Sequence, residues 1–176
     1  MSNDLVQQLG YANLDTRLKR ISDKMSHSLR AMYRELDMDT EPNWYLVFWI
    51  IREQPNASVT EIAARLQFTH QSVINMTNKM IKKGYLTSQK DSTDRRRTIF
   101  RLTKKTTDNF PRFTRIWEIG KKVTLELLDH DIAIMNHLTA LERNLEQCSF
   151  GERIAAELQL PQHETTPLPN DPRMDR

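Results

Sequence analysis

The side chains with the clearest chemical potential lie in one basic segment, residues 79–105. This segment contains ten lysines and arginines and only two acids, Asp91 and Asp94, which gives it a charge of +8. The whole chain of 176 residues carries +3, so the remainder sums to −5. Such a separation of charge is typical of a protein that binds a polyanion, although a solvated basic face without a partner would have the same composition.

Two short amphipathic helices are predicted at and before the start of this segment. Ser58 and Glu61 have the spacing of a capping box, in which each side chain accepts a hydrogen bond from the other residue's backbone N–H. After a turn at Gln67 and Phe68, whose ring we expect in the core, Thr69 is the next N-cap and Gly84 a C-cap. The apolar residues recur at helical spacing in both helices: Val59, Ile62, Ala63 and Leu66, then Val73, Met76, Met80 and Ile81.

The outer face of the second helix has the side chains that read base edges in a DNA groove. Gln71 and Asn75 can each bond adenine through two atoms, and Lys79 can reach guanine or phosphate. No acid occurs between Glu61 and Asp91, whereas an ordinary solvent-exposed helix more often carries Glu–Lys pairs. A merely polar exposed face is the alternative. The residues predicted to contact DNA from this helix are Thr69, His70, Gln71, Ser72, Asn75 and Lys79.

A β-hairpin with a basic tip is predicted next. Residues 85–88 and 97–102 have strand character, with Thr98, Phe100 and Leu102 alternating against Arg97, Ile99 and Arg101. The residues between them, 91–94, favour a turn. Arginines at an exposed tip suit a narrow minor groove, where the negative potential is strongest, so Arg95, Arg96 and Arg97 are predicted to contact DNA. Asp91 and Asp94 are predicted to orient the tip, Asp94 through a charge-assisted bond to one of the arginines.

These elements together resemble the DNA-binding lobe of the MarR family of bacterial transcriptional regulators. Asp91-Ser92-Thr93-Asp94-Arg95-Arg96, followed by Leu102-Thr103, matches the family's wing pattern at full spacing, and Lys83-Gly84-Tyr85 matches the junction before it. Ser92 stands where the family commonly has proline. The resemblance implies that helix 69–83 enters the major groove and wing 89–97 the minor groove, with Arg96 at the wing tip and Arg95 on a phosphate.

Long helices are predicted on both sides of this lobe. Apolar residues recur every three or four positions over 13–37, 106–128 and 132–148, and Pro111 lies near the first turn of the second of these helices. We expect a mainly α fold with a small β wing in a single domain, 9–155. Its DNA-binding lobe is 42–105 and its dimerisation region 9–38 and 106–155. A homodimer would read a pseudo-palindromic operator with half-sites about 34 Å apart; a monomer whose helices pack on their own lobe is the alternative. Residues 159–176 read as a disordered tail.

One branch of the family is more similar than the rest. Residues 9–44 and Ser149–Ile154 resemble the MarR-type module that is fused to a GNAT acetyltransferase domain. Only 22 residues follow Ile154, and no glycine-rich loop for coenzyme A is among them. We therefore expect no acetyltransferase activity.

Composition limits the other classes of function. A single cysteine excludes an intrachain disulfide framework, no apolar run is long enough to span a membrane, and the N-terminus lacks signal-peptide order, so a cytoplasmic protein is expected. No common catalytic motif occurs, so we expect no enzyme and no cofactor. His130 and His137 have only weak metal-binding spacing, so no metal site is predicted. Cys148 is expected to be a buried packing residue.

The family resemblance also implies a small-molecule effector, bound where the long helices meet the lobe. The aromatic and histidine side chains that could line such a cleft are His27, Tyr33, Trp44, Tyr45, Trp49 and Trp117. Aromatic residues at helical spacing are more often simple core. Two other functions stay open: a winged helix that binds proteins and not DNA, and a remnant of the regulatory half of an acetyltransferase.

Overall fold

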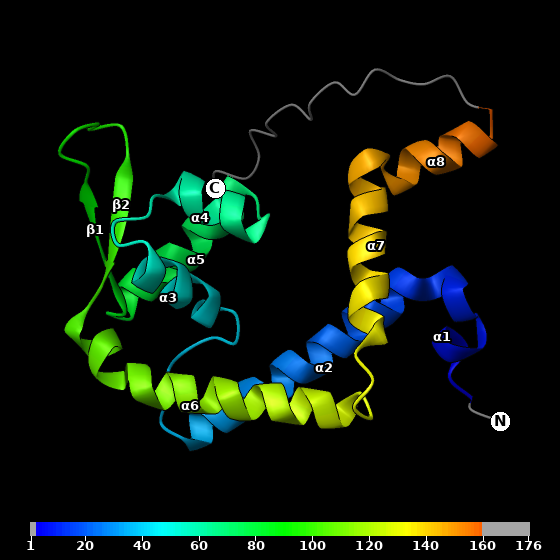
Figure 1. The fold of residues 1–176 in the computed structure, drawn as a ribbon, viewed down its shortest axis with the longest axis horizontal. Helices are drawn as coiled ribbons and strands as arrows, with labels where there is room; N and C mark the ends of the chain where they lie inside the picture. Colours follow the sequence, from blue (N-terminus) through cyan, green and yellow to red (C-terminus); the bar gives the residue numbers. More distant parts are fainter. Residues whose placement is uncertain (1–2, 160–176) are drawn as a thin grey trace, which may run out of the picture. The chain divides into compact units, whose positions relative to one another are not determined.

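The computed structural model describes residues 3–159, and the predicted tail lies outside them except for Gln159. Within these residues the fold is mainly helical with one two-stranded sheet, as predicted (Figure 1). It divides into two compact units, Met1–Ile116 and Trp117–Arg176. The elements are α1 (Leu5–Gln8), a 3-10 helix (Gly10–Asn13), α2 (Leu14–Glu35), α3 (Trp44–Glu53), α4 (Val59–Leu66), α5 (His70–Lys82), β1 (Leu86–Lys90), β2 (Thr98–Leu102), α6 (Lys104–Leu127), α7 (Ala133–Gln147) and α8 (Phe150–Glu157).

An aromatic cluster forms the centre of the first unit. The ring of Phe48 stacks on that of Phe113 with centroids 5.4 Å apart, and the edge of Trp44 meets the ring of Tyr85 at 5.5 Å. Tyr85 also contacts Phe48 at 5.7 Å. These four residues come from α3, the start of the hairpin and α6, and all are buried. Offset and edge-on ring contacts add to the free energy of burial, so the cluster holds these elements together.

The two helices α4 and α5 begin as predicted. The Ser58 hydroxyl accepts from the Glu61 backbone N–H, and the Glu61 carboxylate accepts from the Ser58 N–H at 2.7 Å, which confirms the capping box. Thr69 caps α5 by accepting from the Ser72 N–H. The prediction for Phe68 was wrong, because its side chain is 40% exposed. Gln67, which precedes it, is left-handed (φ 54°) and ends α4, so Phe68 lies in the turn outside the core.

The hairpin pairs β1 with β2 antiparallel, from Leu86 opposite Leu102 to Lys90 opposite Thr98. Each strand begins one residue later than predicted, and β1 continues to Lys90. Alternation sets Ile99 on the same face of the strand as Arg97 and Arg101, yet Ile99 is only 5% exposed. The segment before α4 lies beside β2, where Ser58 bridges Ile99 and the Phe100 N–H donates to the Ala57 carbonyl at 3.0 Å. This additional neighbour covers Ile99.

Helix α6 begins earlier than predicted, at Lys104, so Pro111 lies well inside the helix and not in its first turn. In the second unit, Ser149 and Glu152 form another capping box, which begins a separate helix, α8. Cys148 at the end of α7 is half-buried and not fully buried. Among residues 3–159, no helix combines the length and the apolar character needed to cross a bilayer.

Candidate nucleic-acid interface

The six residues predicted on α5 and its cap form one exposed surface, which we call the recognition face. All six side chains are exposed: Thr69, His70, Gln71, Ser72, Asn75 and Lys79. The buried side of the same helix consists of Val73, Met76, Thr77 and Met80. The Thr77 hydroxyl bonds the Val73 carbonyl at 2.9 Å, so this polar group is satisfied inside the lobe. The helix therefore anchors itself on one side and leaves a polar surface, without an acid, on the other.

Hydrogen bonds within the recognition face orient several of its side chains. The Gln71 amide nitrogen donates to Asn75 Oδ1 at 3.0 Å, as expected for residues four apart on a helix. The Thr69 hydroxyl donates to that of Ser72 at 2.8 Å. Amide side chains that are already ordered lose less conformational entropy when they bond a base. The Gln71–Asn75 pair is therefore preorganised for a contact with a base edge.

The wing, residues 89–97, is closed by its two aspartates. The Asp91 carboxylate accepts from the Thr93 backbone N–H at 2.9 Å and from its hydroxyl at 2.8 Å. These bonds lower the pKa of Asp91 because they favour its charged form. Asp94 accepts from the Arg96 backbone N–H at 2.9 Å. Asp94 thus orients the main chain at Arg96, and the predicted bond from Asp94 to an arginine side chain is not present.

The three wing arginines differ in their surroundings. The Arg97 guanidinium donates to the Glu61 carboxylate at 2.8 Å and lies 3.8 Å from the Asp91 carboxylate. The side chains of Arg95 and Arg96 are exposed and bond no other residue within 3–159. The tip of the hairpin extends clear of α3, α4 and α5 (Figure 1). The structure therefore leaves two guanidinium groups available at the tip and uses the third to tie the wing to α4.

Sequence reasoning missed the part that Glu61 plays at this site. Its capping role was visible from local spacing, but its bond to Arg97 joins residues 36 apart in the chain. Bonds from the Ser58 hydroxyl and backbone, then from Arg97, lower the pKa of Glu61 against the opposing effect of burial. No sequence signal beyond complementary charge points to this pair.

A pocket of about 820 Å³ borders the recognition face. Its lining includes Thr69, Ser72, Asn75 and Lys79 of the recognition face, together with Arg30 of α2 and Trp44 of α3. Of the six predicted effector residues, Trp44 borders this pocket and Tyr33 is a buried residue of α2. His27, Tyr45 and Trp49 are exposed, and Trp117 belongs to the second unit. The effector site stays a prediction.

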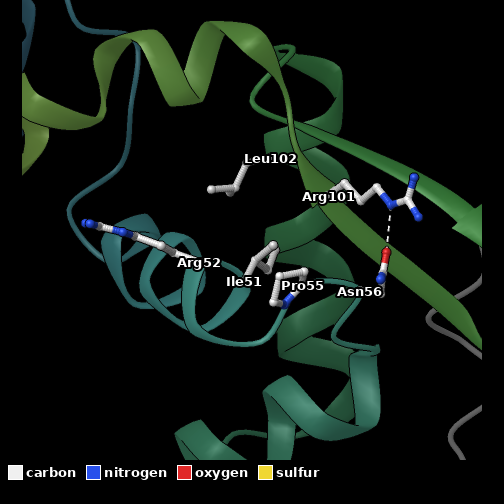
Figure 2. A pocket seen from close by; sticks show the side chains of 6 residues that line it. All are labelled: Ile51, Arg52, Pro55, Asn56, Arg101 and Leu102. Carbon is white, nitrogen blue, oxygen red and sulfur yellow. Dashed lines mark hydrogen bonds between the residues drawn. The ribbon is translucent and has the colours of Figure 1, made fainter.

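A second pocket, of about 440 Å³, lies at the base of the hairpin and shares no lining residue with the first. Figure 2 shows its apolar side chains, Ile51, Pro55 and Leu102, facing the same space. Arg101 donates from Nε to Asn56 Oδ1 at 2.6 Å, and this bond joins β2 to the loop before α4. The bond adds to the Arg97 ion pair and the Phe100–Ala57 backbone bond, which also tie the hairpin to that part of the chain.

Comparisons with known proteins agree with this geometry. The sequence model of the MarR family matches residues 38–97. A MarR protein from Peptoclostridium difficile has a similar solved structure, with a TM-score of 0.66 at 18% identity over 86% of this chain and 98% of that one. No curated protein was found to match the chain in sequence.

Two further structures with a similar fold were solved with DNA. For the MepR–DNA complex of S. aureus the TM-score is 0.65 at 19% identity, over 75% of this chain and 97% of that one. For FabT of Streptococcus pneumoniae in complex with DNA it is 0.56 at 22% identity, over 78% and 98%. Likenesses at this identity establish the fold. Residues 38–97, the part of the chain that the MarR family model matches, hold α3, the recognition face and the wing.

Proposed function

We propose that this protein is a sequence-specific, double-stranded DNA-binding transcriptional regulator without enzymatic activity. The observation that carries the proposal is that one compact unit exposes both an acid-free recognition face and, at a hairpin tip, two arginines whose side chains bond nothing else within 3–159. A polar helix suits the major groove and a basic tip the minor groove, so one lobe can use both on the same duplex. MepR and FabT, which have a similar fold, were solved bound to DNA.

Each part of the site has a proposed role. Helix 69–83 lies in the major groove, where Gln71 and Asn75 contact base edges and Lys79 a guanine or a phosphate; the other groove-facing residues of this helix are Thr69, His70 and Ser72. In wing 89–97, Arg96 enters the minor groove and Arg95 binds a phosphate. Because Arg97 is bonded to Glu61, we propose that it supports the wing, in place of the DNA contact predicted from sequence. Asp91 and Asp94 hold the tip in shape.

We further propose that the protein acts as a homodimer on a pseudo-palindromic operator and responds to a small molecule. Many large apolar side chains in the second unit are exposed: Ile119, Val123, Leu127, Ile132, Ile134, Met135, Leu145, Phe150, Ile154 and Leu158. Exposed apolar surface of this extent marks an interaction site in a soluble protein. Burying it against a second copy would join two DNA-binding lobes in one dimer. The pocket beside Trp44 is one place for an effector.

Selection of bound fragments from genomic DNA tests the proposal and yields the operator. We expect one enriched site with two related half-sites. On that site, Arg96→Ala should lower the affinity and reduce the slope of log affinity against log salt by about 0.9, because its charge in the minor groove no longer displaces a counterion. Arg143→Ala is a matched control, because Arg143 is an exposed arginine in the second unit with no bonding partner within 3–159. An unchanged salt slope for Arg96→Ala would show that the wing assignment is incorrect.

The rival function is a winged helix that binds a protein partner and not DNA. In that case even random duplex at low salt would give no shift in a gel, since the basic lobe would not need to approach phosphates. The remnant of an acetyltransferase regulatory half is the third possibility, and an acetyl-transfer assay with acetyl-coenzyme A would detect residual activity.

A further inference from the structure

Asp39 lies at a junction that the proposed function does not use. It follows α2, and it contacts the end of α5, the start of the hairpin and the start of α6. Building on the proposed function, we infer that Asp39 is a positioning residue: it fixes the end of the recognition helix relative to α2 and so sets the spacing of half-sites that a dimer accepts.

The contacts of Asp39 come from three different elements. The Tyr85 hydroxyl donates to the Asp39 carboxylate. Lys105 Nζ donates to the same carboxylate at 3.2 Å, and Lys83 Nζ donates to the Asp39 backbone carbonyl at 2.7 Å. Lys83 is the C-cap of α5, Tyr85 directly precedes β1, and Lys105 is in the first turn of α6. One residue therefore ties the segment after α2 to the C-terminal end of the recognition helix.

The two lysines are themselves held in place. Lys105 Nζ also donates to the Lys83 carbonyl at 2.9 Å, so it satisfies a backbone acceptor at the end of α5. Lys105 lies 4.0 Å from the centroid of the Tyr85 ring, and Lys83 lies 5.5 Å from that of the Trp44 ring. Both rings belong to the central aromatic cluster. Cation–π contacts of this kind favour one position of each ammonium group.

A neighbouring hydrogen bond also holds the segment after α2 in place. Arg112 of α6 donates to the backbone carbonyl of Leu36, the C-cap of α2. Residues 36–39 are thus attached to α6 and to the end of α5 through both backbone and side-chain atoms. A segment with this many bonds has few alternative positions.

The charges make the junction stronger than a set of neutral bonds. Burial raises the pKa of Asp39, but the bonds from Tyr85 and Lys105 and the positive charges of Lys105 and Lys83 outweigh it and bring the pKa below its ordinary value. Burial first, and then the bond to Asp39, raise the pKa of the Tyr85 phenol. At neutral pH the carboxylate is charged and the phenol keeps its proton. Hydrogen bonds to a charged group contribute more than neutral ones.

Removal of the Asp39 side chain is expected to change the position of the recognition helix more than the stability of the lobe. The Asp39 side chain is about half exposed, so its removal leaves the aromatic cluster in place. What disappears are the bonds of the carboxylate to Tyr85 and Lys105, so the segment after α2 keeps only the bond from Lys83 to the Asp39 backbone carbonyl and the bond from Arg112 to the Leu36 carbonyl. In a dimer joined through helices such as α2, the direction of α5 relative to α2 determines how far apart two recognition helices lie. Since B-DNA repeats about every 34 Å, a dimer with fixed geometry accepts one half-site spacing and discriminates against others.

The experiment measures affinity for a series of duplexes that contain the selected half-sites with base pairs added or removed between them. For the wild type we expect a clear optimum of spacing. For Asp39→Ala we expect the discrimination between the optimum and its neighbours to fall about tenfold, with wild-type affinity for a single half-site; a tenfold change is about 1.4 kcal/mol. Asp39→Asn keeps an acceptor but no charge, so it should restore part of the discrimination. Tyr85→Phe removes the same bond from its other end and should resemble Asp39→Ala.

Glu35→Ala is the matched control, because Glu35 is an exposed acid near the end of α2 with no bonding partner within 3–159. It should behave as the wild type. Thermal unfolding of each variant verifies that the lobe is folded. If the wild type binds the selected DNA and Asp39→Ala keeps its spacing optimum, or if the wild type itself has no optimum, the role of Asp39 is refuted while DNA binding stands. If the wild type binds no duplex, the proposed function itself fails.

Discussion

The guanidinium of Arg97 donates to the carboxylate of Glu61 at 2.8 Å, and so joins the base of the wing to the first turn of α4. Glu61 simultaneously accepts from the Ser58 backbone N–H at 2.7 Å. The residue that begins α4 and the residue that anchors the wing therefore share one carboxylate. The position of the arginine tip depends on the same group as the first helix of the helix-turn-helix.

The first prediction separates support from direct binding among the wing arginines. Arg97→Ala should reduce DNA affinity because the wing becomes more mobile, but it should leave the salt slope close to that of the wild type. Arg96→Ala should instead lower the slope of log affinity against log salt by about 0.9, because its charge in the minor groove no longer displaces a counterion. Binding measured at several salt concentrations distinguishes the two effects. An equal decrease of slope in both variants would place Arg97 on the DNA.

The second prediction concerns the stability of the folded protein at acidic pH. Bonds to Ser58 and Arg97 hold the pKa of Glu61 below its ordinary value of 4.5 in the folded protein. A carboxyl whose pKa is lowered by folding stabilises the folded state above its unfolded pKa, and this contribution is lost as the pH falls through the folded value. The free energy of unfolding should therefore decrease as the pH falls below about 4.5, and Glu61→Gln should make this decrease less steep. Urea denaturation at a series of pH values measures the free energy of unfolding of both proteins. An equal pH dependence in the wild type and in Glu61→Gln would contradict the role given to the Glu61 carboxylate.

The third prediction compares the two capping boxes. Ser58→Ala should lower the free energy of unfolding by about 1–2 kcal/mol, because an N-cap is removed at a buried position. Ser149→Ala removes the equivalent hydroxyl at the start of α8, where the residue is exposed, and should cost less. Chemical denaturation of both variants gives the comparison. A larger effect of Ser149→Ala than of Ser58→Ala would contradict this prediction.

The fourth prediction concerns base reading by the ordered pair on α5. Asn75→Ala should relax the preference at one base position at a cost of about 1–3 kcal/mol. Because Gln71 donates to Asn75, Gln71→Ala should affect the same position, and the double variant should lose less affinity than the sum of the two. Affinities for operators substituted at each position test this. Independent effects at two separate positions would show that the two side chains act separately.

Features encoded by near neighbours were predictable from the sequence. The capping box at Ser58, the Thr69 cap and the long helix α2 each depend on residues a few positions apart, and all were found. The turn residues of the wing likewise identified the hairpin. Ser149 and Glu152 have the spacing of the first capping box, so α8 could have been predicted from the same rule.

Features that depend on distant segments were not predictable. Strand alternation grouped Ile99 with Arg97 and Arg101, and nothing in 97–102 reveals that the segment at Ala57 and Ser58 lies beside Ile99. The bond of Arg97 to Glu61 joins residues 36 apart, and that of Tyr85 to Asp39 joins residues 46 apart. Each has several possible charged or polar partners in the sequence. Only the fold selects among them.

Pro111 lies inside α6, the helix that runs from the first compact unit into the second. Proline has no amide hydrogen, so the carbonyl of Thr107 receives no bond from the residue four positions later. The bending stiffness of α6 is therefore reduced within the part that belongs to the first unit. When α6 bends, we expect the largest change of direction near Pro111, close to Phe113 and the ring that stacks on it.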